Sequence, residues 1–181
     1  NASSNLPIYY KAVLQFPRVD YAESGTSNGF HVNKSIRNID GSQDIRVGDL
    51  VKVTIDIEKD KTGQSRHYRY IVIDDPLPAG LVAINSSIKT EEVVPENDED
   101  SYTEDGARVL VPSFQEIRDD RVLIFRDSNI WDGKYQYSYY ARATTEGQFV
   151  LPSTKAQLMY SPQVMGLTPK SIINIKASQI R

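Results

Sequence analysis

The fold of this chain is decided most clearly by the stretch Asp49-Leu-Val-Lys-Val-Thr-Ile-Asp-Ile57. Its apolar side chains Val51, Val53, Ile55 and Ile57 alternate with polar ones. A period of two is typical of a β-strand that buries one face and shows the other to water. We therefore predict a half-buried strand here.

Runs of the same kind recur on both sides of this strand. Gly, Pro, Asn or Asp separates most of these runs, which lie at 11–16, 67–73, 121–125, 134–144, 148–151 and 171–177. Pro76 and Pro78 follow the second run closely and should end it, because proline lacks the amide hydrogen that a central strand needs. About seven or eight short strands separated by turns are typical of an antiparallel β-sandwich. The sequence predicts an all-β fold, with at most one short helix, at 84–93 or 154–160.

Three tyrosines, Tyr135, Tyr137 and Tyr139, share one face of the strand predicted at 134–144. Aromatic rings in a row can stack on sugars or bases, with Trp131 at the edge. They are also ordinary cross-strand neighbours inside a sandwich. Because tyrosine is amphipathic and the chain has only five Phe, we favour packing over a ligand platform.

Two polar segments depart from the strand pattern. Residues 21–44 are rich in Gly, Ser and Asn, with short strands indicated only at 30–32 and 36–39. Residues 91–106 carry eight acidic side chains. Carboxylates suit calcium, but a helix-loop-helix calcium loop also needs a glycine at its sixth position, and the run has none there. We predict a solvated loop at 91–106 and no metal site.

The overall composition excludes several classes of protein. The 181 residues include 21 Lys and Arg against 24 Asp and Glu, and no Cys. A chain without cysteine forms no disulfide, thiolate zinc site or thiol nucleophile of its own. The absence of a basic cluster argues against nucleic acid as a partner, and no apolar run is long enough to enter a membrane. We expect a single domain over 1–181, to which the first 45 residues add an opening strand and a loop.

An enzymatic function finds little support in the sequence. His31 and His67 are the only imidazoles, and no Gly-x-Ser-x-Gly motif accompanies them. Asp74 and Asp75 are adjacent, so in a strand they point to opposite faces and make a poor acid/base pair. We predict a structural role for one of these carboxylates, no catalytic residue and no cofactor. A hydrolase with an unrecognised triad stays as a weak third possibility.

Several longer motifs follow one another between residues 45 and 177. The most specific are Asp75-Pro-Leu-Pro-Ala-Gly80 and Arg142-Ala-Thr-Thr145, and they are supported by Ile45-Arg-Val-Gly-Asp-Leu-Val-Lys-Val53 and Met159-Tyr-Ser-Pro162. In this order and spacing they resemble the C-terminal macroglobulin-like domain of bacterial alpha-2-macroglobulins. The resemblance implies a sandwich of the macroglobulin or immunoglobulin kind.

The resemblance also implies a function that belongs to a larger parent protein. Such proteins inhibit endopeptidases by trapping them: cleavage of a bait segment exposes a thioester that can acylate the protease. The C-terminal domain is non-catalytic and packs against the thioester domain, which would be its partner within the parent; target proteases would be met only through the full-length protein. The resemblance implies the periplasm or cell envelope as the location, with a lipid anchor on the N-terminal part of the parent.

A contact site can be suggested within this resemblance. A thioester is an activated acyl group, so a dry apolar cover slows its hydrolysis. Met159 and Tyr160, on a loop stiffened by Pro162, are our candidates for this shielding contact, with Trp131 as a second one. The alternative role for Tyr160 is to plug the end of the sandwich. The alternative function for the whole domain is that of a surface adhesin or carbohydrate-binding module that uses the tyrosine face.

Overall fold

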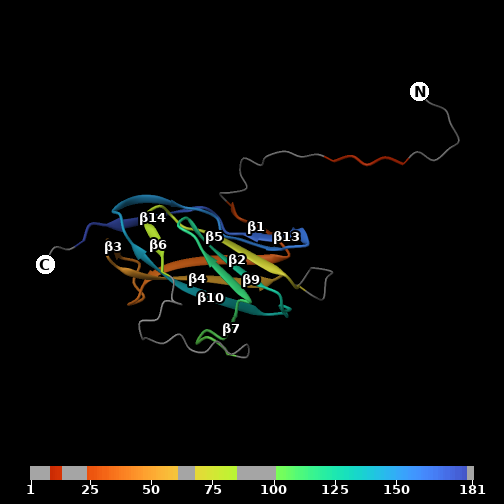
Figure 1. Cartoon of the computed structure of the whole chain (residues 1–181), viewed down its shortest axis with the longest axis horizontal. Coiled ribbons are helices and arrows are strands. Elements are labelled where there is room, and N and C mark those ends of the chain that lie inside the picture. Colours follow the sequence, from red (N-terminus) through yellow and green to blue (C-terminus); the bar gives the residue numbers. More distant parts are fainter. Residues whose placement is uncertain (1–8, 14–23, 61–67, 85–100, 179–181) are drawn as a thin grey trace, which may run out of the picture.

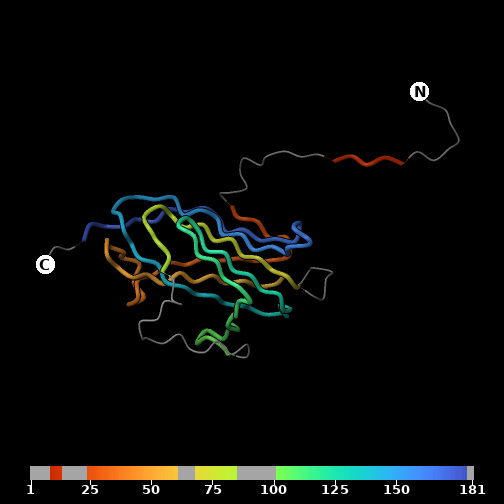
Figure 2. The backbone as a smooth tube through the Cα atoms, in the orientation of Figure 1, coloured from red at the N-terminus to blue at the C-terminus, as the bar shows by residue number. Residues whose placement is uncertain are grey.

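A computed structural model describes residues 9–13, 24–60, 68–84 and 101–178 of the chain (Figure 1). Fourteen strands make up the regular structure of these ranges. They form sheets that pack as a sandwich, as the tube in Figure 2 shows. The prediction of an all-β sandwich is confirmed.

One layer is a six-stranded sheet in which all neighbours are antiparallel. Its strands, in order across the sheet, are β1 (Thr26–Asn28), β13 (Ser161–Leu167), β12 (Lys155–Leu158), β5 (Ile71–Pro76), β9 (Arg121–Arg126) and β8 (Phe114–Ile117). The hairpins β8–β9 and β12–β13 are local, but the pairings of β5 with β9 and β12 and of β1 with β13 join distant parts of the chain, so this layer depends on long-range pairing.

The second layer is a five-stranded sheet. Its strands are β2 (Phe30–Asn38), β4 (Leu50–Lys59), β10 (Lys134–Ala143) and β6 (Leu81–Ala83), with β7 (Arg108–Val109) also paired to β10. A third, smaller sheet, at the left in Figure 1, consists of β11 (Gly147–Leu151), β14 (Ser171–Lys176) and β3 (Ile45–Arg46).

The segment before residue 45 contributes more to the sandwich than its polar composition indicated. The two short strands predicted at 30–32 and 36–39 are one continuous strand, β2, which pairs with β4 from Phe30 to Asn38. Of the strand predicted at 11–16, residues 11–13 are described and are not in a strand, and the rest lies outside the described residues. The period of two was hidden because Lys34, a polar residue, stands on the inward face of β2 between Val32 and Ile36.

The helix suggested at 154–160 is wrong, because Lys155–Leu158 form strand β12 between β5 and β13. Ala156 and Leu158 are 0% and 8% exposed, while Lys155 and Gln157 are only half-buried. This alternation was present in the sequence, but four residues are too few for periodicity to separate helix from strand. Apart from Ile84, the other suggested helix lies outside the described residues.

Strand β5 begins and ends later than predicted. It runs from Ile71 through Asp74 and Asp75 to Pro76. Alternation predicts that Tyr68 and Tyr70 lie on the same side, yet their exposed fractions are 2% and 40%. The cause is a backbone φ of 57° at Tyr70, which turns the chain just before the strand.

The core lies between the two large sheets. From β4, Val51, Val53, Ile55 and Ile57 are all 0% exposed, as their alternation predicted. Burying each of these side chains stabilises the fold by about 1.5–3 kcal/mol. The quoted stretch therefore does decide the fold: it supplies the centre of the five-stranded sheet.

Asp75 connects the two layers through polar contacts inside this core. Its carboxylate, 0% exposed, accepts a bond from Lys34 Nζ on β2 at 2.6 Å. The hydroxyls of Tyr139 on β10 and of Thr154, just before β12, each donate to it at 2.5 Å. Lys34 also donates to the carbonyl of Pro76 at 3.1 Å. The predicted structural role of this aspartate is confirmed, although its partners come from distant strands rather than from the adjacent loop.

A buried ion pair of this kind holds the layers in one register. The side chains of Lys34 and Asp75 are 2% and 0% exposed, so either charge left alone would stay in a medium that solvates it poorly. Asp74, the next residue, points outward and pairs with Arg121 at 3.1 Å, where its side chain is 35% exposed. The two adjacent carboxylates thus differ in the free energy that each pairing can contribute.

We expect Asp75→Asn to lower the free energy of unfolding by about 3–5 kcal/mol, because it leaves the Lys34 ammonium buried without a counter-charge. The matched control Asp74→Asn should cost about 1 kcal/mol or less, because its pair is partly exposed. Urea denaturation of the two variants and the wild type measures both losses. Equal losses would show that Asp75 does not hold the layers together.

Candidate functional site

Met159 and Tyr160 form the tight turn between β12 and β13. Tyr160 is 79% exposed and Met159 is 46% exposed. The amide of Met159 donates to the carbonyl of Tyr70 at 2.8 Å. The Tyr160 ring stands edge-on to the Tyr70 ring, with centroids 5.2 Å apart. A ring this exposed does not plug the end of the sandwich; it projects from the surface against a second aromatic ring.

Tyr70 is a member of this site that the sequence did not indicate. A φ of 57° lies in the left-handed region, which a bulky residue seldom adopts and which costs roughly 1–3 kcal/mol. The hydrogen bond from the Met159 amide to the Tyr70 carbonyl holds Tyr70 in this conformation. The Arg69 guanidinium lies 5.2 Å from the centroid of the Tyr70 ring. The sequence carried no signal for Tyr70, because a left-handed backbone conformation is normally predicted from glycine or asparagine.

Trp131 lies on the connection between β9 and β10 and is 54% exposed. The preceding residue, Ile130, donates its amide to the carbonyl of Tyr68 at 2.9 Å, which joins this connection to the segment that carries Tyr70. The β12–β13 turn and the β9–β10 connection lie at the same end of the sandwich (Figure 2). The structure therefore puts all three predicted residues at one end and brings Met159 and Tyr160 into contact with Tyr70.

The two most specific sequence motifs meet beside the small sheet. Leu81, which follows Asp75-Pro-Leu-Pro-Ala-Gly80, pairs with Ala143 of the second motif. The amide of Thr144 donates to the carbonyl of Gly80 at 2.9 Å. A Cβ atom at Gly80 would come within 2.5 Å of the Phe149 ring, so only glycine fits there. The motifs are thus parts of one packed corner.

Comparison with protein families matches residues 29–163 to the bacterial alpha-2-macroglobulin MG10 domain. The chain belongs to this family. An alpha-2-macroglobulin homolog from Nostoc sp. is 26% identical over 180 residues, which cover 92% of this chain and 9% of the relative. The chain therefore spans only a small part of the length of this relative.

Solved structures share the fold of this MG10 domain. Salmonella alpha-2-macroglobulin reacted with methylamine superposes with a TM-score of 0.65 at 24% identity, over 86% of this chain and 10% of that one. Trypsin-activated alpha-2-macroglobulin from Escherichia coli superposes with a TM-score of 0.66 at 22% identity, over 84% and 11%. The resemblance inferred from the motifs is confirmed.

The tyrosine stripe of the MG10 domain faces the core. Tyr135, Tyr137 and Tyr139 are 3%, 8% and 5% exposed. The Tyr137 hydroxyl donates to Gln115 Oε1 at 2.7 Å across the sandwich, and the Tyr135 hydroxyl accepts the Trp131 amide at 3.0 Å. With no ring of the three at the surface, the interpretation of the stripe as a sugar-binding platform is wrong, and packing was the correct alternative.

The titration of these hydroxyls follows from their burial. Burial raises the pKa of Tyr137 from 10.0 to about 12. Burial, together with the negative charge of Asp75, raises the pKa of Tyr139 still further. Both hydroxyls therefore keep their protons in the folded domain and act as hydrogen-bond donors.

Other candidate sites give no sign of chemistry within the described part of the chain. His31 is exposed on the outer face of β2, and His67 lies outside the described residues, as does most of the acidic segment 91–106. In the described ranges, no three His, Asp or Glu side chains gather as metal ligands. No helix in those ranges could cross a membrane.

The raised pKa values predict how stability depends on alkaline pH. Above pH 10 the unfolded chain loses its tyrosine protons before the fold does, so stability is fully present below that pH and falls as pH rises towards 12. Tyr137→Phe should flatten this fall, and Tyr140→Phe, on the outer face of the same strand, should not. The midpoint of urea unfolding, determined for each variant between pH 10 and 12, measures this loss of stability. If the midpoint falls with pH equally steeply in both variants, the loss does not come from Tyr137.

Proposed function

We propose that this domain is the non-catalytic C-terminal module of a bacterial alpha-2-macroglobulin-type protease trap. In the parent it packs against the thioester domain and shields the thioester from water. Family membership and the small share of the Nostoc relative that the chain spans support this role. The observation that carries the shielding contact is the exposure of Tyr160, 79%, on a turn that Tyr70 buttresses.

The turn has the physical properties that a shield requires. Tyr160 offers a wide apolar ring with a polar tip, and Met159 adds an adaptable apolar side chain beside it. The hairpin partner Ser161 faces Leu158, and the Met159 amide is bonded to Tyr70, so the loop is held before any partner arrives. A pre-formed contact loses little conformational entropy on docking.

The solved relatives suggest which reagents would act on the parent. The Escherichia coli protein has been observed after activation by trypsin and by porcine elastase, and the Salmonella protein after reaction with methylamine. We propose that proteases trigger the parent of this domain in the same way, and that a small amine reports how well its thioester is covered. The proposal for Trp131 is a weaker contact at the margin of the same cover.

The rate at which the full-length parent reacts with methylamine tests the shield. Tyr160→Ala should raise that rate by about tenfold or more, because it removes most of the ring that excludes water and amine. Tyr160→Phe should stay near the wild-type rate, and Trp131→Ala should have a smaller effect. Tyr140→Ala, which removes a ring from the opposite sheet, is the control. A Tyr160→Ala parent that reacts as slowly as wild type would refute the shielding role.

We also propose that the parent lies in the cell envelope, held in the periplasm by a lipid anchor on its N-terminal part. The support is the family to which this domain belongs. Fractionation of cells that produce the parent tests it: the protein should leave with the membranes and enter the soluble fraction when the acylated segment is removed. Recovery from the cytoplasm would contradict this location.

A further inference from the structure

We propose that the outer face of the six-stranded sheet is a second docking surface, which packs against another apolar-faced domain of the same parent polypeptide. This inference rests on the proposed function in one respect: it takes the parent to contain further domains. It concerns a different surface from the Tyr160 turn, and it assigns the domain a broad contact in addition to a local shield.

A mainly apolar row crosses this outer face from the edge strand β8 to β13. Cross-strand pairing aligns, in order, Phe114, Phe125, Val72, Gln157 and Met165. Their neighbours along each strand point inward, as the burial of Ile73 and Ile124 at 1% and 0% shows. The row is therefore a property of the sheet register: four of these five members are apolar, and the polar Asn28 continues the row onto the edge strand β1.

These side chains lie where water reaches them. Phe114 is 61% exposed, and its ring is tilted against that of Phe125 with centroids 5.9 Å apart. Phe125, Val72 and Met165 are half-buried. A sheet face that meets water normally carries polar side chains, because apolar surface gains stability only when it is removed from water.

The outer face of the five-stranded sheet shows what such a solvated face looks like in this same domain. Gln136 donates to Asp56 at 2.9 Å, and Lys134 pairs with the same carboxylate at 3.0 Å. Thr54 and Ser138 lie hydroxyl to hydroxyl at 3.3 Å. The middle of this face thus carries paired polar side chains, whereas the row on the opposite face is mainly apolar.

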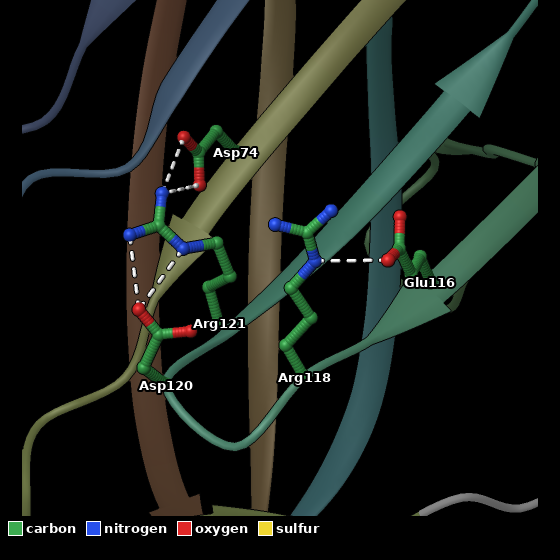
Figure 3. A network of polar contacts seen from close by, with 5 residues as sticks. All are labelled: Asp74, Glu116, Arg118, Asp120 and Arg121. Atoms are coloured by element: carbon green, nitrogen blue, oxygen red, sulfur yellow. Dashed lines mark hydrogen bonds and ion pairs between the residues drawn. The ribbon is translucent and has the colours of Figure 1, made fainter.

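Charged side chains border the apolar row on one side. Figure 3 shows Arg121 between Asp74 and Asp120, with contacts of 3.1 and 3.0 Å, and Arg118 beside Glu116 at 2.8 Å. Every charged side chain in this network already has a partner within it, so a domain docked on the row would not leave any of these charges unpaired. An apolar centre with a polar rim is the usual anatomy of an interface.

The occupant follows from how much of the polypeptide lies outside this domain. The chain amounts to 9–11% of the Nostoc, Salmonella and Escherichia coli relatives. A domain linked in one chain meets its neighbours at a high effective concentration, so a moderate apolar contact is enough to keep it docked.

Single cysteines can measure whether this face is covered, because the chain has none of its own. We would introduce Phe114→Cys, and separately Tyr140→Cys as the control on the opposite face, in the 181-residue chain and in the native full-length parent. Maleimide labelling is followed by peptide mass mapping, which separates the new thiol from any other cysteine of the parent. Val72→Cys, close to the original in volume, repeats the test in mid-row.

In the parent, the Phe114 position should label at least about tenfold more slowly than in the isolated chain, because a docked face reacts only when it opens. The Tyr140 position should label at similar rates in both. Equal rates at Phe114 would overturn the proposal, as would equal slowing at both positions. Protection that appears in the isolated chain as its concentration rises would also overturn it, because the occupant would then be a second copy.

These outcomes are independent of the shielding test. The labelling experiment reads the accessibility of β8 and β5 and does not depend on a thioester. If Tyr160→Ala leaves methylamine reactivity unchanged while the Phe114 position is protected, the docking surface stands and the shield fails. The reverse result would leave the shield standing and refute the docking surface.

Discussion

The buried contact between Asp75 and Lys34 is the constraint on which the rest of this sandwich depends. A carboxylate without exposure is stable only if its charge is matched, and here an ammonium from β2 and hydroxyls from Tyr139 and Thr154 match it. These donors come from both layers. The layers must therefore meet in one register, because any shift would leave a charge unpaired in the core.

That register decides which residues face inward and which face out. A slip of one residue in a strand exchanges its two faces, so the placement of Asp75 inside also places Asp74 outside, beside Arg121. The same parity turns the tyrosines of β10 towards the core and leaves the Phe114 to Met165 row on the surface. Because Asp75 faces the core, the register of the six-stranded sheet turns the row from Phe114 to Met165 towards the surface.

The proposed function follows from which aromatic rings are buried with partners in the core and which are exposed at the surface. The hydroxyls of Tyr137 and Tyr139 are occupied by partners within the sandwich, so these two rings are not available to a ligand. Tyr160 and Met159 remain at the surface, on a turn supported by a strained Tyr70. We therefore propose contact with other domains, rather than chemistry, for these surfaces of the MG10 domain.

The sequence by itself determined the fold class, the central strands and the family, because alternation at Val51 to Ile57 and ordered motifs such as Asp75 to Gly80 are local signals. It also selected Met159 and Tyr160 through that family. Only the tertiary structure decided that β2 is one long strand, that residues 155–158 are not helical, and that Tyr70 turns back to meet Tyr160. The physical reason is that these features depend on pairing between distant segments, and a local period carries no information about which strand lies opposite.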